Sequence, residues 1–305
     1  MKNNIKIIVI SLKNSKRIFK LKKRLKKIKV NYKIIEGVDG KLYKKKNKLI
    51  SIYDKKSTLK NIGRELAESE IGCAASHLKA YNYIIKNKIE QAIIMEDDAF
   101  PSKFLYQWIK NNIKIENNKI LNFYCYPNGF IGGKPYKSLF NNTIKLHNII
   151  GHSFGAACYQ INNYTCKKII SLTRNKVIGL PDWPFSTTYH KIELAITLPF
   201  LAFIDDDGWS HLQNDRKKEL KENQFIKKLL HPIIIKILRV PYYLSYLPYL
   251  ISKYPNKYLY YEHYVQSIIS KFKNIFFNNY LELTKIYYKK NYYYKDLKKI
   301  VKFPY

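Results

Sequence analysis

The first hundred residues alternate between short apolar runs and segments whose apolar residues recur at helical spacing. A run of about four to eight apolar residues with polar neighbours is typical of a buried strand. Ser15 can cap a helix in which Ile18, Leu21 and Leu25 share one face, and a second helix is expected from Glu65 onward. The runs that predict strands are residues 5–12, 32–35 and 91–95.

The same alternation continues over the next hundred residues and predicts the fold class. A helix is expected near Asn162, whereas the Lys-rich residues 41–60 are predicted to form a surface loop. Strands that alternate with helices favour an α/β protein with a mainly parallel sheet and helices on both faces. The further predicted strands are residues 120–126, 154–161 and 192–204, the last with a break at Pro199.

The composition changes after about residue 220, where Lys, Tyr, Ile and Leu dominate and acidic residues become rare. We therefore predict one domain over residues 1–220 and a basic, aromatic-rich helical extension over residues 221–305. Tyr at the level of lipid head groups and Lys against anionic lipid suit a membrane surface. The alternative is a small helical subdomain that packs on the sheet, and the two interpretations are compatible.

The chain is strongly basic, with 56 Lys and Arg against 22 Asp and Glu and a formal net charge of +34. Such a field attracts polyanions, which include nucleotide phosphates, anionic lipids, lipopolysaccharide and nucleic acid. The four cysteines form no Cys-x-x-Cys pair and stand among apolar or small residues, so we expect thiols in a reducing compartment. We expect a cytoplasmic protein without a transmembrane helix, with peripheral contact to the inner membrane face as an option.

Three adjacent carboxylates, Glu96, Asp97 and Asp98, follow the apolar run 91–95. In so basic a protein they are costly unless a cation or a substrate uses them. Side chains alternate along a strand, so Glu96 and Asp98 would project together while Asp97 points away. Two carboxylates suit Mn²⁺ or Mg²⁺, which keeps positions open for phosphate oxygens and can neutralise a diphosphate leaving group. The alternative is a turn or a helix cap, where Asp is common.

The surrounding motifs resemble the bacterial glycosyltransferase family 25, the lipooligosaccharide and lipopolysaccharide galactosyltransferases. The resemblance spans roughly residues 5–213, and its most specific part is the pair formed by a Glu-Ile-Gly-Cys-x-x-Ser-His run and the Glu-Asp-Asp run. Ser69, where the family commonly has Gly, and the bulky Trp183 are departures. The segments that carry the resemblance are Val9-Ile-Ser-Leu12 with Arg17, Val38-Asp-Gly40, Glu70-Ile-Gly-Cys-Ala-Ala-Ser-His-Leu78, Met95-Glu-Asp-Asp98, Gly155-Ala-Ala-Cys-Tyr159 and Pro181-Asp182.

The resemblance implies a GT-A-like, Rossmann-type fold, a nucleotide-sugar donor that is usually UDP-galactose, a divalent cation and inversion at the anomeric carbon. Glu96 and Asp98 resemble the family's counterpart of a DxD motif, with Asp98 preferred as the direct metal ligand. His211 could complete the coordination sphere, although a lone His is more often structural.

Inverting transfer needs a base that takes the proton from the acceptor hydroxyl. Asp182 is our candidate, because it stands in a stiff loop between Pro181 and Trp183, whose ring could stack on a sugar. Its alternative role is to cap a turn. The rival candidates for the base or for metal support are the cluster Asp205, Asp206 and Asp207.

Several residues near the predicted strand ends are candidates for donor binding. Lys13 and Arg17 could contact the diphosphate, whereas Gly37 and Gly40 would let the backbone approach the base or ribose. Glu70 and His77 could face the nucleotide from one helix or could only tie that helix to a strand. The full set of donor candidates is Lys13, Arg17, Gly37, Asp39, Gly40, Glu70, His77 and Glu96.

The leading hypothesis is therefore a hexosyltransferase that adds a sugar, galactose by resemblance, to a bacterial lipooligosaccharide, lipopolysaccharide or related surface glycan. One rival is a nucleic-acid-binding protein, although Lys dominates where base recognition usually recruits Arg. A second is a metal-dependent phosphohydrolase, which should show more His and Asp ligands for two metals. A third, a family member that only binds sugar, fits the intact acidic run poorly.

Overall fold

The computed structural model describes residues 5–27, 29–62, 65–124, 131–141, 143–150, 155–182, 184, 192–198 and 200–204. The predicted extension over residues 221–305 lies outside this range. The strands are β1 Ile5–Ser11, β2 Tyr32–Glu36, β3 Gln91–Glu96, β4 Ala99–Pro101, β5 Lys119–Asn122, β6 Ile131–Leu139, β7 Ile144–Ile150, β8 Cys158–Asn162, β9 Glu193–Leu198 and β10 Ala202–Ile204. The helices are α1 Arg17–Lys27, α2 Gly40–Lys45, α3 Leu49–Ile52, α4 Lys55–Ile62, α5 Glu68–Lys86, α6 Lys103–Lys110 and α7 Asn163–Thr173.

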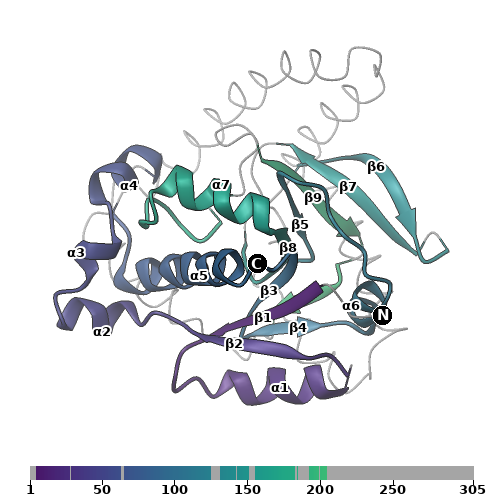
Figure 1. Ribbon diagram of the computed structural model, residues 1–305, viewed down its shortest axis with the longest axis horizontal. Helices are drawn as coiled ribbons and strands as arrows, with labels where there is room; N and C mark the ends of the chain where they lie inside the picture. Colours follow the sequence, from purple (N-terminus) through teal and green to yellow (C-terminus); the bar gives the residue numbers. More distant parts are fainter. Residues whose placement is uncertain are drawn as a thin grey trace, which may run out of the picture.

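One eight-stranded sheet organises the described residues, in the order β2-β1-β3-β8-β5-β9-β7-β6. The pairings make β2, β1, β3, β5, β9 and β6 point the same way, while β8 and β7 run against them. The short strands β4 and β10 pair separately. The predicted α/β class with a mainly parallel sheet is thus confirmed, and Figure 1 shows the sheet among its helices.

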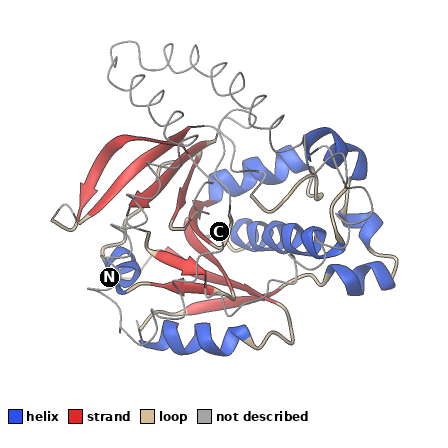
Figure 2. Ribbon diagram, turned by 180° about the vertical axis from the view of Figure 1, so that it is seen from behind, coloured by secondary structure: helices blue, strands red, loops and turns tan. Residues whose placement is uncertain are grey.

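Both faces of the sheet are covered, because alternate residues of the central strands enter two different cores. Ile8 and Ile10 of β1 face the core that holds α5 and α7, whereas Ile7 and Val9 face the core that holds α1 and α6. The reverse view in Figure 2 shows helices on either side of the strands. The near-continuous apolar runs in the sequence follow from this arrangement, since a strand buried on both faces needs no polar face.

The N-terminal strands and helices were predicted nearly in place, but residues 41–60 are not the loop that we expected. They form the short helices α2, α3 and α4. Asp39 caps the first by accepting a hydrogen bond from the backbone N–H of Leu42, and Asp54 caps the third. Apolar Leu49 and Ile52 pack against the core around α5, so this Lys-rich stretch is amphipathic rather than irregular.

The second half of the domain differs more from the prediction. The strand expected over 154–161 is β8, which begins at Cys158 and runs antiparallel to β3 and β5. The predicted strand over 192–204 is confirmed as β9 and β10, and α7 begins next to Asn162 as expected, with Asn162 as its N-cap. The β6–β7 hairpin and α6 were not predicted. None of the helices in the described ranges is both long and apolar enough to cross a membrane.

Candidate active site

The acidic run lies at the carboxyl edge of the sheet, as its position after an apolar strand predicted. Glu96 is the last residue of β3 and pairs with Ile10 of β1, while Asp97 and Asp98 form the turn to β4. Because β1 and β3 are parallel, both strands end at the same edge, where α/β proteins bind ligands. Arg17, the first residue of α1, reaches this edge from the helix that follows β1.

The two aspartates of the turn share one arginine. Arg17 places its two terminal nitrogens 2.9 Å from Asp97 Oδ1 and 2.9 Å from Asp98 Oδ2. Ser11 Oγ donates a hydrogen bond to the other Asp97 oxygen at 2.9 Å. The predicted alternation of Glu96, Asp97 and Asp98 therefore fails at Asp97, because the strand ends at Glu96 and the turn brings Asp97 and Asp98 onto the same guanidinium. Asp97 is buried, which agrees with a structural role.

The surroundings of Asp98 strongly raise its pKa. Burial, and then the negative charge of Glu96, raise the pKa of Asp98 to about 7, although Arg17 opposes the shift. Its second oxygen, Oδ1, is buried and has no hydrogen-bond partner among the described residues. A hard divalent cation fits this donor set, since it takes carboxylate oxygens as ligands and relieves the repulsion between the acids.

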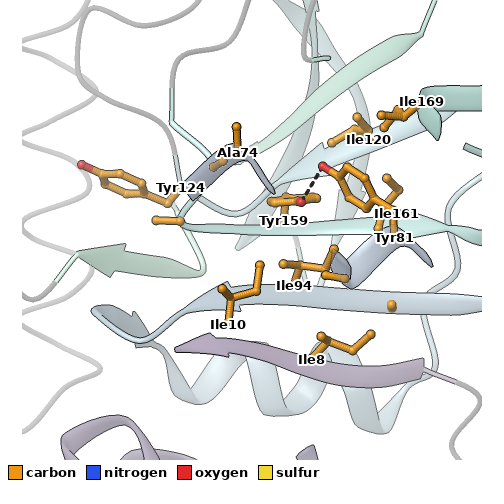
Figure 3. Close-up of a cluster of buried hydrophobic side chains, with 14 of the residues drawn as sticks. Ile8, Ile10, Ala74, Tyr81, Ile94, Ile120, Tyr124, Tyr159, Ile161 and Ile169 are labelled. Carbon is orange, nitrogen blue, oxygen red and sulfur yellow. Dashed lines mark hydrogen bonds between the residues drawn. The ribbon is translucent and has the colours of Figure 1, made fainter. Parts of the chain in front are cut away.

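Glu96 faces helix α5 instead of Arg17. His77 Nε2 lies 3.2 Å from Glu96 Oε1, and the thiol of Cys73 lies 3.9 Å from the same oxygen. Burial raises the pKa of Glu96, but the hydrogen bond and charge of His77, with Arg17, outweigh it and hold that pKa below its ordinary value. Behind the imidazole, His77 Nδ1 lies 2.8 Å from the hydroxyl of Tyr159, which lies 2.8 Å from that of Tyr81. Figure 3 shows the two tyrosine hydroxyls meeting inside the apolar core.

The other donor candidates near α5 have defined structural contacts in this conformation. Glu70 is fully buried and accepts a hydrogen bond from the backbone N–H of Ala67, so it caps its own helix. A Cβ on Gly40 would lie 1.6 Å from the Glu68 carbonyl oxygen, which means that α2 and α5 meet backbone to backbone. Gly37 donates its N–H to Ser11 at 2.7 Å. Contact of these residues and of Asp39 with a donor remains a prediction.

Asp182, the candidate base, accepts a hydrogen bond from the backbone N–H of Gly155 at 2.9 Å. This contact ties the predicted stiff loop to the segment that leads into β8. A cavity of about 20 Å³, room for about one water molecule, separates residues 178–181 and Pro184 from the α5 face that carries His77. The loop thus lies near His77, which contacts Glu96. Lys13 is exposed in the turn after β1. The rival acids Asp205, Asp206 and Asp207, and the candidate ligand His211, lie outside the described residues.

Sequence reasoning missed three side chains that belong to the cluster around Glu96: Cys73, Tyr81 and Tyr159. Cys73 and His77 are four residues apart, the spacing that puts two side chains on one helix face, so the motif itself contained a signal for Cys73. Tyr81 is likewise four residues after His77 on α5, whereas Tyr159 comes from β8 and nothing in its local sequence places it beside His77.

A mainly parallel sheet with helices on both faces and carboxylates at its carboxyl edge defines a GT-A-like α/β protein, the class predicted from the sequence. The chain belongs to glycosyltransferase family 25, described as LPS biosynthesis proteins, whose family model matches residues 4–182. It is therefore a glycosyltransferase, and the family implies a nucleotide-sugar donor and an acceptor. Because the chain belongs to this family, the glycosyltransferase hypothesis is preferred over the nucleic-acid-binding and phosphohydrolase alternatives. No curated protein matches the chain.

Three examples represent the solved structures to which the chain is similar in outline. One is the mannose-1-phosphate geranyltransferase from Thermus thermophilus, with 10% identity, TM-score 0.36 and coverage of 63% of this chain and 73% of that chain. A second is A197 from STIV, with 16% identity, TM-score 0.35 and coverage of 66% and 86%. The third is a glycosyltransferase involved in the glycosylation of the major capsid of PBCV-1, with 12% identity, TM-score 0.34 and coverage of 70% and 99%. At such TM-scores these likenesses support no functional conclusion.

Proposed function

We propose that this glycosyltransferase is inverting and metal-dependent, and that it moves galactose from UDP-galactose onto a lipooligosaccharide, lipopolysaccharide or related surface glycan. The observation that carries the proposal is the buried, unpartnered Oδ1 of Asp98 at the edge where β1 and β3 end, in a chain of family 25. The reaction would take place in the cytoplasm, at the inner face of the membrane.

Asp98 and Glu96 would hold a divalent cation, Mn²⁺ or Mg²⁺, which when bound neutralises the charge of the diphosphate leaving group. The contacts of Glu96 with His77 and Cys73 both fall on Oε1, so Oε2 can face the cation while His77 keeps the carboxylate oriented. Arg17 is 44% exposed and already bridges Asp97 and Asp98, which places a positive charge where phosphate oxygens would arrive.

The acceptor side needs a base on the face opposite the leaving nucleotide. Asp182 suits this role because the N–H of Gly155 fixes one carboxylate oxygen and leaves the other to accept a proton. The net charge of +34 supports an anionic acceptor, since a positive field concentrates anionic substrates near the protein.

The donor and the metal are tested by one set of rate measurements. With purified full-length protein and Mn²⁺, UDP-galactose should be hydrolysed or transferred with a higher kcat/KM than UDP-glucose or the UDP-N-acetylhexosamines. EDTA should abolish the reaction, and so should Asp98→Asn. Glu90→Gln is the matched control, because Glu90 is an exposed acid beside the opposite end of β3, where it pairs with Lys114.

Full activity in EDTA, or in Asp98→Asn, would remove the cation from the proposal. A preference for another UDP-sugar would correct the donor while leaving the metal in place.

A further inference from the structure

Three side chains of different chemistry converge beside the acidic turn: Cys73 and His77 of α5 and Glu96 of β3. Their ligand atoms, Sγ, Nε2 and Oε1, all lie within 4.8 Å of one another. The nitrogen and oxygen are 3.2 Å apart, and the sulfur and oxygen are 3.9 Å apart. Cys73 and His77 project from one helix face because they are four residues apart, and the end of β3 lies across from that face.

We propose that Cys73, His77 and Glu96 form a binding site for a borderline transition-metal cation, Zn²⁺, with a fourth position open to water. For a tetrahedral zinc site with ordinary zinc–sulfur, zinc–nitrogen and zinc–oxygen bonds, neighbouring ligand atoms stand about 3.4 to 3.6 Å apart. The separations to Glu96 Oε1 differ from these values by only a few tenths of an ångström. The sulfur and the His77 nitrogen lie within 4.8 Å of each other, so side-chain rotations that bring these two atoms to the tetrahedral separation would complete the geometry.

The donor set separates this site from the one assigned to the donor's cation. Thiolate and imidazole ligands favour Zn²⁺, whereas carboxylate and water ligands favour Mg²⁺ and Mn²⁺. Asp98 offers only oxygen and belongs to the hard site, while Cys73 supplies the soft ligand that such a site does not need. One thiolate and one carboxylate also balance the charge of a divalent ion, with the thiol proton released to solvent on binding.

The surroundings of His77 are those of a metal-binding imidazole. A histidine that binds a metal through one ring nitrogen usually donates the other N–H to a fixed acceptor. His77 Nδ1 lies 2.8 Å from the Tyr159 hydroxyl, and Tyr159 lies 2.8 Å from the Tyr81 hydroxyl. Both tyrosines are buried, and a tyrosine hydroxyl can both donate and accept a hydrogen bond.

The two hydroxyls let His77 adopt either tautomer. When the ring is neutral and no metal is bound, Tyr159 donates to Nδ1 and the Nε2–H donates to Glu96. With a metal, the Nδ1–H donates to Tyr159, and the lone pair of Nε2 faces the ion. His77 is 1% exposed and Glu96 has a side chain 24% exposed, so the ion would enter from the Glu96 side.

The binding test uses Co²⁺ as a spectroscopic probe and Zn²⁺ as the competitor, on full-length protein without a histidine tag, freed of metal by a chelator. Addition of Co²⁺ should produce a thiolate-to-cobalt charge-transfer band that saturates at one ion per chain, and one equivalent of Zn²⁺ should remove it. Cys73→Ser should lose the band. Cys166→Ala is the control, because Cys166 is a buried thiol of α7 outside the cluster.

Two further variants separate the site from its surroundings. Asp98→Asn should keep the band, since Asp98 supplies no ligand to the cluster. Tyr159→Phe should weaken Zn²⁺ affinity by about 10- to 100-fold, the effect of removing a hydrogen-bond partner from a metal-bound histidine. Circular dichroism of each variant confirms that the chain has folded.

The proposal is overturned if no charge-transfer band appears, or if the band persists in folded Cys73→Ser. This outcome is independent of the donor chemistry, since a protein that fails to use UDP-galactose can still bind cobalt. Only the functional consequence rests on the proposed function: because Glu96 serves both sites, Zn²⁺ should lower the transfer rate measured with Mn²⁺, and Cys73→Ser should relieve that inhibition.

Discussion

Replacing Asp98 by asparagine should stabilise the metal-free protein, and the gain should grow with pH. The substitution keeps the shape of the side chain and an oxygen that can accept a hydrogen bond from Arg17, but it removes a carboxylate whose pKa is raised to about 7. The rise above the ordinary value of 3.8 corresponds to about 4 kcal/mol, at about 1.4 kcal/mol per pKa unit. The side chain is only 14% exposed, so solvent screens this cost weakly.

The sign follows from where the proton is bound in each state. Below about pH 4 the carboxyl is protonated in both the folded and the unfolded chain, so Asp98 costs nothing. Between about pH 4 and pH 7 the unfolded chain ionises while the folded chain keeps its proton, and the free energy of unfolding falls as pH rises. Above pH 7 both states are ionised and the cost is constant. The asparagine of the variant titrates in neither state, so the variant should gain about 2 kcal/mol at pH 5 and about 4 kcal/mol at pH 8.

The free energy of unfolding is measured from urea transitions of full-length protein at about pH 5, 6.5 and 8, with a chelator present. Glu90→Gln is again the control and should change stability by less than about 0.5 kcal/mol at each pH, as exposed substitutions do. A gain that does not vary with pH, or a loss at pH 8, would refute the reasoning. The first result would mean that the gain does not come from the ionisation of Asp98, and the second that Arg17 already stabilises the ionised carboxylate in full.

Three further outcomes are expected. Gly40→Ala should destabilise the fold by at least about 2 kcal/mol in urea melts, because the new methyl group would meet a carbonyl oxygen of α5, whereas the exposed Lys41→Ala should have little effect. Asp182→Asn should abolish turnover yet keep the melting temperature, since the asparagine carbonyl can still accept from Gly155; normal turnover would move the base elsewhere. Deletion of residues 226–305 should abolish binding to anionic vesicles in a sedimentation assay, and unchanged binding would contradict a membrane role for the tail.

The sequence predicted the elements whose signals are local. A buried strand such as β3 is visible as an unbroken apolar run, and α1 is visible from its helical spacing and basic last turn. The helices between residues 40 and 62 were not predicted, because Lys dominates their sequence and their apolar residues pack only against the edge of one core. The β6–β7 hairpin contains Gly and Pro within its first strand, which weakens the alternating pattern.

The residues of the candidate site also divide into those with a local sequence signal and those without one. Glu96, Asp98 and Arg17 were recognisable from their positions at the ends of strands or the start of a helix. The pairing of Arg17 with both aspartates depends on the strand ending at Glu96, so that the alternation predicted through Asp98 does not continue. The partners of His77 depend on β8 lying beside β3, a pairing between strands more than 60 residues apart that periodicity does not reveal.

Helix α5 explains why the motif Glu70-Ile-Gly-Cys-x-x-Ser-His77 is so closely spaced. Gly72 and Ser76 form one pair four residues apart, and they face the first loop: a Cβ on Gly72 would lie 2.5 Å from the Val38 oxygen, and Ser76 Oγ accepts the Val38 N–H at 2.7 Å.

Cys73 and His77 form the next such pair, about 100° further around the helix, and they face Glu96. One rigid helix therefore fixes the distance between the glycine loop after β2 and the acidic end of β3. A nucleotide-sugar that contacts both the loop and the acidic run would depend on that distance, so Gly72→Ala, whose new Cβ would meet the Val38 oxygen, should raise the KM for the donor.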